Sequence, residues 1–144
     1  MKLQSTRLGE LEIDEEQIID FPRGIPGFPD EKAFVHIPYG EESPFSFLQS
    51  ANEPNLTFLL VDPFAFFTDY EFELDDEAAS ELGVSSENPP QVFLIANVKG
   101  EIVDMTVNLL APVILNPVNH RGRQIILEKK DYSIRHKLFS QGGE

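Results

Sequence analysis

Residues 56–74 have the sequence LTFLLVDPFAFFTDYEFEL and contain two patterns that are typical of β-structure. Leu56 to Val61 is a nearly continuous apolar run, as in strands that are covered on both faces. Asp69 to Leu74 alternates acidic with apolar side chains, so that one face of a strand would be apolar and the other acidic. This stretch therefore predicts a buried strand followed by a strand with an acidic outer face.

The rest of the chain has the pattern of strands and turns that is typical of a β-protein. Short runs rich in Val, Ile, Phe and Thr alternate with clusters of Pro, Gly, Asn and Asp. We expect a hairpin within residues 1–15 and further strands at residues 18–21, 33–37, 45–49, 91–99, 105–115 and 124–127. Pro112 would confine the strand that contains it to a sheet edge or a bulge. One helix is predicted from Asp75 to Leu82, because acids occupy its first turn and Gly83 follows it.

The spacing of these elements predicts one domain. A length of 144 residues is typical of a single domain, and 41% apolar residues with 12 Phe suffice for an ordinary core. We expect an all-β fold with one or two short helices, arranged as a compact single-domain β-barrel, with a sandwich as the other arrangement of such strands. The domain would span residues 1–144, with about residues 3–139 ordered and residues 140–144 forming a flexible tail.

Composition excludes several function classes. The chain contains no Cys, which excludes disulfides, thiolate metal sites and Cys nucleophiles. No apolar stretch approaches the roughly 18 residues that cross a bilayer, and the acidic start of the chain does not resemble a secretory or transit sequence. We therefore expect a cytoplasmic protein with no membrane partner.

The chain is strongly acidic, with 25 acids, 11 bases and a formal net charge of −14. Such a field disfavours direct binding of nucleic acid and speeds encounters with basic proteins, although a need for solubility would also explain it. The segment from Arg121 onward holds six bases and three acids, whereas the first 120 residues hold five bases and 22 acids. We expect this basic segment to pack beside the acidic body of its own chain.

Motifs for catalysis or metal binding are missing from the sequence. His36, His120 and His136 do not have the spacing of a local metal site, and no serine-hydrolase or phosphate-loop motif occurs. Same-face acids within residues 69–73 would lie about 6.6–6.8 Å apart, as in inverting glycosidases, but catalysis needs a buried carboxyl group and a solvated outer face is favoured. We therefore predict no enzyme activity, no metal, no cofactor and no small-molecule substrate.

Two segments remain as candidates for a binding surface. Residues 62–69 hold three Phe, of which at least two would fill the core and one could remain at the surface beside the acids. An aromatic ring rimmed by charge is typical of protein-binding hot spots. Residues 24–28, GIPGF, are favoured as a rigid corner with Ile25 and Phe28 in the core over a direct partner contact.

Several of these segments together resemble the FliW family of flagellar assembly factors. The similar segments are residues 21–28 (FPRGIPGF, against the family's Phe-x-x-Gly-Ile-Pro-Gly-Phe), 62–74, 106–116, 122–127 and 132–135. The resemblance runs in this order from about Leu3 to Phe139, which is nearly the whole chain. Thr68 departs from the family pattern, in which many relatives carry Pro, and this should alter the rigidity of the loop.

The resemblance implies a compact β-barrel that binds two alternative partners in the bacterial cytoplasm. One is flagellin, which FliW-like proteins hold before export, in the manner of a chaperone. The other is the translational regulator CsrA, which they antagonise allosterically, away from its RNA site. Flagellin export and flagellin translation would thus be coupled without chemistry. The acidic body of this chain suits a basic RNA-binding partner.

The acidic face is the predicted site for CsrA. The candidate residues are Phe64, Asp69, Tyr70, Glu71, Glu73 and Asn108, with Tyr70 or Phe64 as anchors. For flagellin, the aromatic segment from Phe64 to Phe67 is a hypothesis. Two alternatives stay open: a β-barrel that binds a small ligand in its interior or hydrolyses a substrate there, and RNA binding by the basic segment after Arg121.

Overall fold

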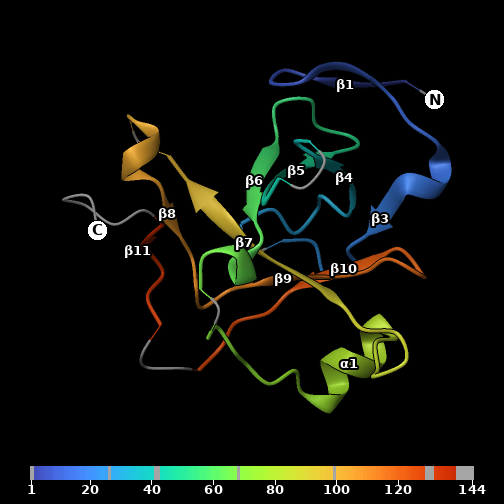
Figure 1. The fold of residues 1–144 in the computed structure, drawn as a ribbon. Helices are drawn as coiled ribbons and strands as arrows, with labels where there is room; N and C mark the ends of the chain where they lie inside the picture. The colour runs from blue at the N-terminus through green and yellow to red at the C-terminus, as the bar shows by residue number, and fades with distance from the viewer. Residues whose placement is uncertain are drawn as a thin grey trace.

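The computed structural model describes residues 2–25, 27–40, 43–67, 69–98, 100–128 and 132–138. The strands are β1 (Lys2–Ser5), β2 (Gly9–Glu12), β3 (Ile18–Asp20), β4 (Ala33–Pro38), β5 (Phe45–Ser50), β6 (Thr57–Val61), β7 (Gln91–Asn97), β8 (Thr106–Val107), β9 (Val113–Asn116), β10 (Arg121–Gln124) and β11 (His136–Lys137) (Figure 1). The helical elements are the α-helix α1 (Asp76–Leu82) and the 3-10 turns η1 (Glu15–Gln17), η2 (Pro63–Ala65) and η3 (Ile102–Asp104). Among the described residues, no helix is long and apolar enough to cross a membrane. The tail expected at residues 140–144 lies outside the described residues.

Seven strands close into a barrel, in the order β7, β6, β5, β4, β3, β10 and β9, and β9 pairs back with β7. The length of β7 permits this closure: its first residues, Gln91–Phe93, pair with β9, whereas Ala96 and Asn97 pair with β8. β3 and β10 run parallel, and the other neighbours in the ring run antiparallel. The predicted all-β barrel is therefore confirmed.

Large apolar side chains fill the barrel. The rings of Phe21 and Phe34 are fully buried and meet edge to face, with 5.2 Å between their centroids. Leu48 from β5 and Leu60 from β6 are fully buried in the same cluster. Because alternate residues of a strand point to the same side, the runs of Phe, Leu, Ile and Val noted in the sequence supply this interior.

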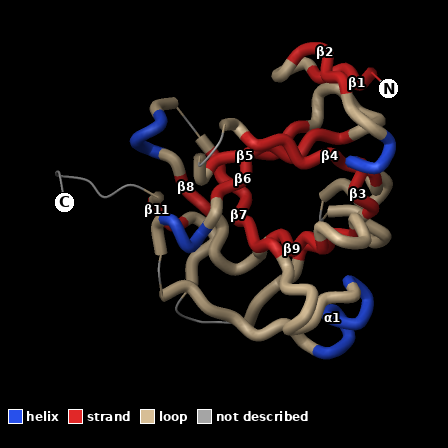
Figure 2. Tube along the Cα trace, turned by 45° about the vertical axis from the view of Figure 1, so that its right-hand side comes forward, coloured by secondary structure: helices blue, strands red, loops and turns tan. Residues whose placement is uncertain are grey.

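The β1–β2 hairpin and α1 lie at opposite ends of the molecule (Figure 2). Leu3 of the hairpin packs on Val35 of β4, so the hairpin is attached to the barrel by its own small apolar cluster. α1 begins after Asp75, whose carboxylate accepts a hydrogen bond from the backbone N–H of Ala78 at 2.8 Å, and it ends at Gly83, which has a φ of 73°. The hairpin and helix predictions are both confirmed.

An ion-pair network attaches α1 to the barrel. The carboxylate of Glu81 lies 2.9 Å from Arg23 and 3.5 Å from Arg123, and the Glu81 carbonyl accepts a hydrogen bond from Arg121 at 3.0 Å. The hydrogen bond from Arg23 lowers the pKa of the Glu81 carboxyl group, and the charges of the three arginines lower it further. At Arg121 and Arg123, the expected packing of the basic segment against its own body is confirmed.

Most strand predictions agree with the structure, and the exceptions have physical reasons. The strand expected at residues 105–115 is instead two strands, β8 and β9, because the chain turns after β8, where the Asn108 amide oxygen accepts a hydrogen bond from the backbone N–H of Leu110. The strand expected at residues 124–127 lies earlier, at Arg121–Gln124, so the prediction and the strand share only Gln124. β11 has too few residues to produce a pattern. Residues 69–74, although alternating, form no strand in the described chain.

The corner at residues 24–28 agrees with the prediction only in part. Ile25 is 1% exposed, as expected, but Phe28 is 42% exposed. The Phe28 ring instead packs edge to face on the ring of Phe58, with 5.8 Å between the ring centroids.

Candidate functional site

Tyr70 anchors the acidic segment, residues 69–75, to the molecule. Its side chain is buried, and its hydroxyl donates a hydrogen bond to the carbonyl of Leu109 at 2.8 Å. Its ring stacks on Tyr132, with 5.1 Å between centroids. Burial raises the pKa of Tyr70 above its ordinary value, with the neighbouring Tyr132 adding to the effect, so the hydroxyl remains a donor at all physiological pH values. Tyr70 is therefore an internal anchor, and its hydroxyl is already engaged with Leu109.

A side chain takes the place of a neighbouring strand beside Glu71. The Tyr132 hydroxyl accepts a hydrogen bond from the backbone N–H of Glu71 and donates one to its carbonyl, both at 2.9 Å. Backbone groups of an extended segment need such partners, and a ladder is only one way to supply them. This explains why the alternating segment is held in place without being a strand.

The predicted facing of the segment is confirmed even though the predicted strand is not. Phe72 and Leu74 are half-buried and pack on the apolar clusters below them. The acids that alternate with them, Asp69, Glu71 and Glu73, are exposed. The segment therefore presents an exposed row of carboxylates on a fixed backbone.

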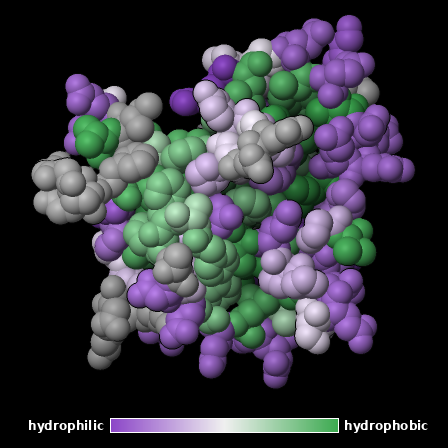
Figure 3. All heavy atoms as spheres, viewed as in Figure 1, coloured by the Kyte–Doolittle hydropathy of each residue, from purple (hydrophilic) through white to green (hydrophobic). Residues whose placement is uncertain are grey.

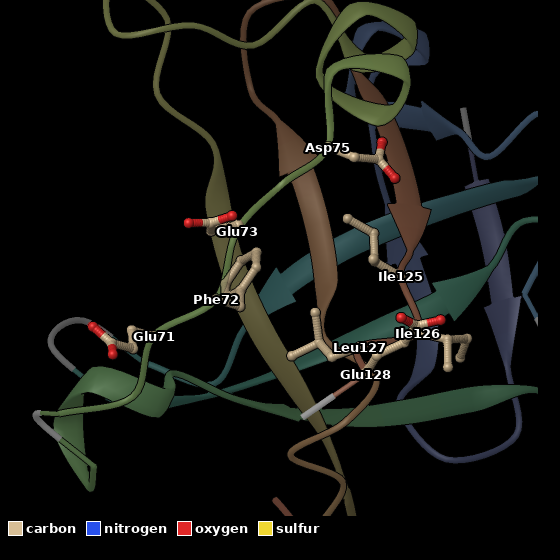
Figure 4. A pocket seen from close by; sticks show the side chains of 8 residues that line it. All are labelled: Glu71, Phe72, Glu73, Asp75, Ile125, Ile126, Leu127 and Glu128. Atoms are coloured by element: carbon tan, nitrogen blue, oxygen red, sulfur yellow. The ribbon is translucent and has the colours of Figure 1, made fainter. Parts of the chain in front are cut away.

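A groove runs beside this acidic segment. Its volume is about 650 Å³, and its two walls are residues 71–75 and residues 125–128. Figure 4 shows Phe72 and Leu127 directed into the space between the walls, and Glu71 directed away from it. The residues that line the groove are Glu71, Phe72, Glu73, Asp75, Ile125, Ile126, Leu127 and Glu128. The groove thus has an apolar interior and an acidic rim, the arrangement of a protein-binding surface.

The three Phe of the aromatic segment separate as the sequence suggests. Phe66 and Phe67 are half-buried against the core, whereas Phe64 on η2 is 47% exposed, and its ring lies 6.2 Å from that of Tyr70. Figure 3 shows the face of the molecule that is turned toward the viewer in Figure 1. Apolar side chains gather near the middle of that face, and many hydrophilic side chains lie toward its margins. Phe64 is thus an exposed ring close to the acidic row, where an anchor was expected.

Asn108 does not join this surface through its own side chain. Its amide oxygen accepts a hydrogen bond from the backbone N–H of Leu110 at 3.0 Å, which shapes the turn after β8. It lines a separate hollow with Ile134 and Arg135. The structure therefore places Phe64, Asp69, Glu71 and Glu73 at one surface with Tyr70 buried beneath it, whereas Asn108 lines a different hollow.

Sequence reasoning did not find the second wall of the groove. Residues 125–128 come some fifty positions after the acidic segment, and chain order alone does not indicate that the two are neighbours. Tyr132 was likewise seen only as part of a family segment, not as the partner of Glu71. In the sequence, Ile126 is one residue of a short apolar run, and only the structure shows that its side chain is 65% exposed.

The arrangement offers little for catalysis. The acids of residues 69–73 are exposed, whereas a general acid needs a buried carboxyl group. Among the residues that the structure describes, no group of three or more His, Asp or Glu side chains is placed to hold a metal ion.

A second hollow, of about 480 Å³, bears on the alternative of a small ligand in the barrel. It lies where the β4–β5 turn meets β7, and its polar groups include His36, Ser46 and Gln91. The His36 Nε2 lies 2.8 Å from the Ser46 hydroxyl, and burial lowers the pKa of the His36 ring. The barrel interior next to it is occupied by Phe93, which lies against His36 and packs on the buried apolar cluster.

The chain matches the family model described as FliW protein over residues 2–138. It belongs to the FliW family. A crystal structure titled as that of the flagellar assembly factor FliW has the same fold, with a TM-score of 0.89 and 38% sequence identity over 99% of both chains. A flagellar assembly factor FliW from Desulfitobacterium hafniense (strain DSM 10664 / DCB-2) is 64% identical over 98% of this chain and 93% of its own length. Another, from Heliobacterium modesticaldum, is 44% identical over 96% of this chain and 91% of its own length.

The FliW signature at residues 21–28 has a structural role in this chain. Phe21 and Ile25 are core residues, Arg23 pairs with Glu81 on α1, and Gly24 forms the turn between them. The second FliW block supplies the exposed Phe64 and the acidic wall of the groove. In this FliW family member the first block thus builds the scaffold, and the second carries the candidate site.

Replacing Tyr132 by Phe should loosen the acidic wall. The substitution removes both hydrogen bonds to Glu71 while keeping the ring stacked on Tyr70, at a cost of about 1 kcal/mol. Amide hydrogen exchange should become faster at Glu71, and urea unfolding should report the small loss of stability. Tyr39→Phe, at a side chain that is 72% exposed, is the control. An unchanged exchange rate at Glu71 would contradict this role of Tyr132.

Proposed function

We propose that this protein is a non-catalytic factor of flagellar assembly that works in the bacterial cytoplasm by holding other proteins. It binds flagellin before export and, as an alternative, binds CsrA and antagonises it allosterically. Nucleic acid and small molecules are not its ligands. Membership of the FliW family supports the role in flagellar assembly, because the relatives are named as flagellar assembly factors.

The exposed carboxylate row of residues 69–73 is the observation that carries the binding role. These acids stand on a backbone held by Tyr70 and Tyr132, beside a groove with an apolar interior. A rigid acidic surface suits a basic partner, because complementary charge speeds association and fixes the orientation of the complex. CsrA, as an RNA-binding protein, is such a partner. Phe64 supplies an exposed ring at the edge of this surface.

The two partners compete through linkage. If binding of flagellin lowers the affinity for CsrA, then CsrA lowers the affinity for flagellin by the same factor, whether the two surfaces overlap or communicate at a distance. Accumulated flagellin would thereby release CsrA, and export of flagellin would let the protein return to CsrA. Translation of flagellin would follow its export.

A mixed pull-down tests this function. The purified protein is offered CsrA alone, flagellin alone and both together. We expect capture of each partner separately and displacement of CsrA as flagellin is added. If neither partner is captured, the proposed function is wrong. A stable complex of all three proteins would show that flagellin and CsrA do not compete.

Reversing the charge at Glu71 and Glu73 should slow the encounter with CsrA. The double variant Glu71→Lys/Glu73→Lys should lower the association rate constant by about tenfold at low salt and weaken its dependence on salt, because steering by opposite charge is lost. Surface plasmon resonance at several salt concentrations measures both quantities.

The matched control is Glu15→Lys/Glu16→Lys. It makes the same change of net charge at two exposed acids of η1, away from the groove. If the two double variants slow association equally, the effect comes from net charge and the site lies elsewhere.

A further inference from the structure

We propose that the groove between residues 71–75 and residues 125–128 binds an extended, lysine- or arginine-bearing segment of a partner protein, which adds to the barrel as a strand. This inference rests on the protein-binding role proposed above and specifies how a partner is held. Three features carry it: an open strand edge, an apolar interior and an acidic rim.

The open edge continues β10. In the β9–β10 ladder, Gln124 is opposite Val113. Beyond the end of β10, the N–H of Ile125 donates to the carbonyl of Pro112 at 3.0 Å, and that of Leu127 donates to the carbonyl of Leu110 at 2.7 Å. These contacts keep the register of the ladder, so residues 125–127 continue the strand past its formal end.

The side of this continued strand that faces the groove has backbone groups available for hydrogen bonds. In an antiparallel strand, successive residues direct their N–H and C=O groups to opposite sides. Since Ile125 and Leu127 face residues 110–112, Ile126 and Glu128 face the other way, toward the groove. Within the described part of the chain, no hydrogen bond reaches the N–H of Ile126 or of Glu128. Such an edge is a template for an added strand.

The opposite wall leaves the space between the walls open. The backbone N–H and C=O of Glu71 are both bonded to the Tyr132 hydroxyl and not to the opposite wall. Among the described residues, no backbone hydrogen bond joins residues 71–75 to residues 125–128. The space between the walls has a volume of about 650 Å³.

Charge and hydrophobicity select the occupant. Phe72, Ile125 and Leu127 are half-buried and provide apolar contacts for every second side chain of an inserted strand. Glu71 and Glu128 on the rim are exposed, with no ion-pair partner among the described residues. Long basic side chains on the other face of the inserted strand can reach this rim. A second copy of this chain would bring the same acids and be repelled.

The probe is a peptide of about seven residues in which lysine and valine alternate, with both ends capped. Its binding to the intact protein is measured by isothermal titration calorimetry and by the NMR shifts of the Ile126 and Glu128 amides. Two further peptides carry N-methyl groups on all valines or on all lysines. Because the N–H groups of alternate residues point to opposite sides, at least one methylated peptide should lose affinity by about tenfold. A glutamate–valine peptide should not bind.

A protein variant tests the edge independently. Ile126→Pro removes the N–H that faces the groove and places a ring there, while the bonds of Ile125 and Leu127 to residues 110–112 remain. It should lower affinity for the lysine–valine peptide by about tenfold, whereas Ile126→Ala, which keeps the N–H, should have a smaller effect. If Ile126→Pro does not fold, the methylated peptides still decide the question.

Undiminished binding of both methylated peptides would overturn strand addition, because charge alone would then hold the peptide. So would failure of the lysine–valine peptide to bind while CsrA or flagellin is captured, and in that case the proposed function would stand without this mode of binding. Peptide binding that is sensitive to methylation, with neither CsrA nor flagellin captured, would support the groove and remove the proposed function.

Discussion

Gly24→Ala should lower the free energy of unfolding by about 3–5 kcal/mol, a large part of the roughly 5–15 kcal/mol that a domain of this kind has. Gly24 has a φ of 65°, which an alanine adopts only with strain. An added Cβ would also lie 2.6 Å from the carbonyl oxygen and 2.7 Å from the Cα of Pro29. These are backbone atoms, so they cannot move aside without opening the corner that buries Ile25.

The control for this prediction is Gly27→Ala, in the same corner. Gly27 has a φ of 92°, but nothing lies within 4 Å of its added Cβ. Its substitution should therefore cost only the conformational strain, about 1 kcal/mol. Urea unfolding of the two variants separates strain from steric overlap. Equal losses of stability would mean that the contact with Pro29 does not limit position 24.

Phe21→Ala should lower the free energy of unfolding by about 3–5 kcal/mol, because it leaves a cavity in the centre of the barrel. The Phe21 ring is fully buried and packs edge to face on the Phe34 ring, with 5.2 Å between the ring centroids. It also lies against the backbone of Gly122, where an added Cβ would be 2.5 Å from the Phe21 Cζ. The pair therefore joins the FliW signature to β10, the strand whose continuation forms the second wall of the groove.

A double-mutant cycle tests that contact. Gly122→Ala alone should cost about 1–3 kcal/mol through overpacking against the Phe21 ring. In the Phe21→Leu background the smaller side chain makes room, so the same substitution should cost less by about 1 kcal/mol. Denaturant unfolding of the four proteins measures this coupling. Additive effects would show that Gly122 and Phe21 do not restrict each other.

The scaffold and the candidate site are thus connected through the strand β10 and the helix α1. The signature corner at residues 21–28 sets the position of β10 through Phe21 and the position of α1 through Arg23. The residues that directly follow β10 form one wall of the groove, and the segment leading into α1 forms the other. Substitutions in the corner should therefore change binding by altering the spacing of the walls, without touching a partner.

Features that depend on neighbours within a few residues could be predicted from the amino-acid sequence. α1 begins one residue after its predicted start, with Asp75 as its N-cap, and ends at the predicted Leu82, before the C-cap Gly83, because these caps act within one turn of the helix. β4, β5 and β6 lie where apolar runs predict them, and Phe72 faces inward because alternation decides which side of an extended backbone is apolar. The acidic character of the exposed face follows from the same alternation.

The neighbours of these elements, in contrast, depend on how distant parts of the chain pack. Residues 69–74 have the pattern of a strand but are not one, since the Tyr132 hydroxyl, 61 positions after Glu71, occupies the backbone groups that a ladder would use. The second wall of the groove is likewise brought to the acidic segment by closure of the barrel through β9 and β10. Local patterns determine how a segment faces the core, but which segments become neighbours depends on how distant parts of the chain pack, and no short stretch of sequence contains that information.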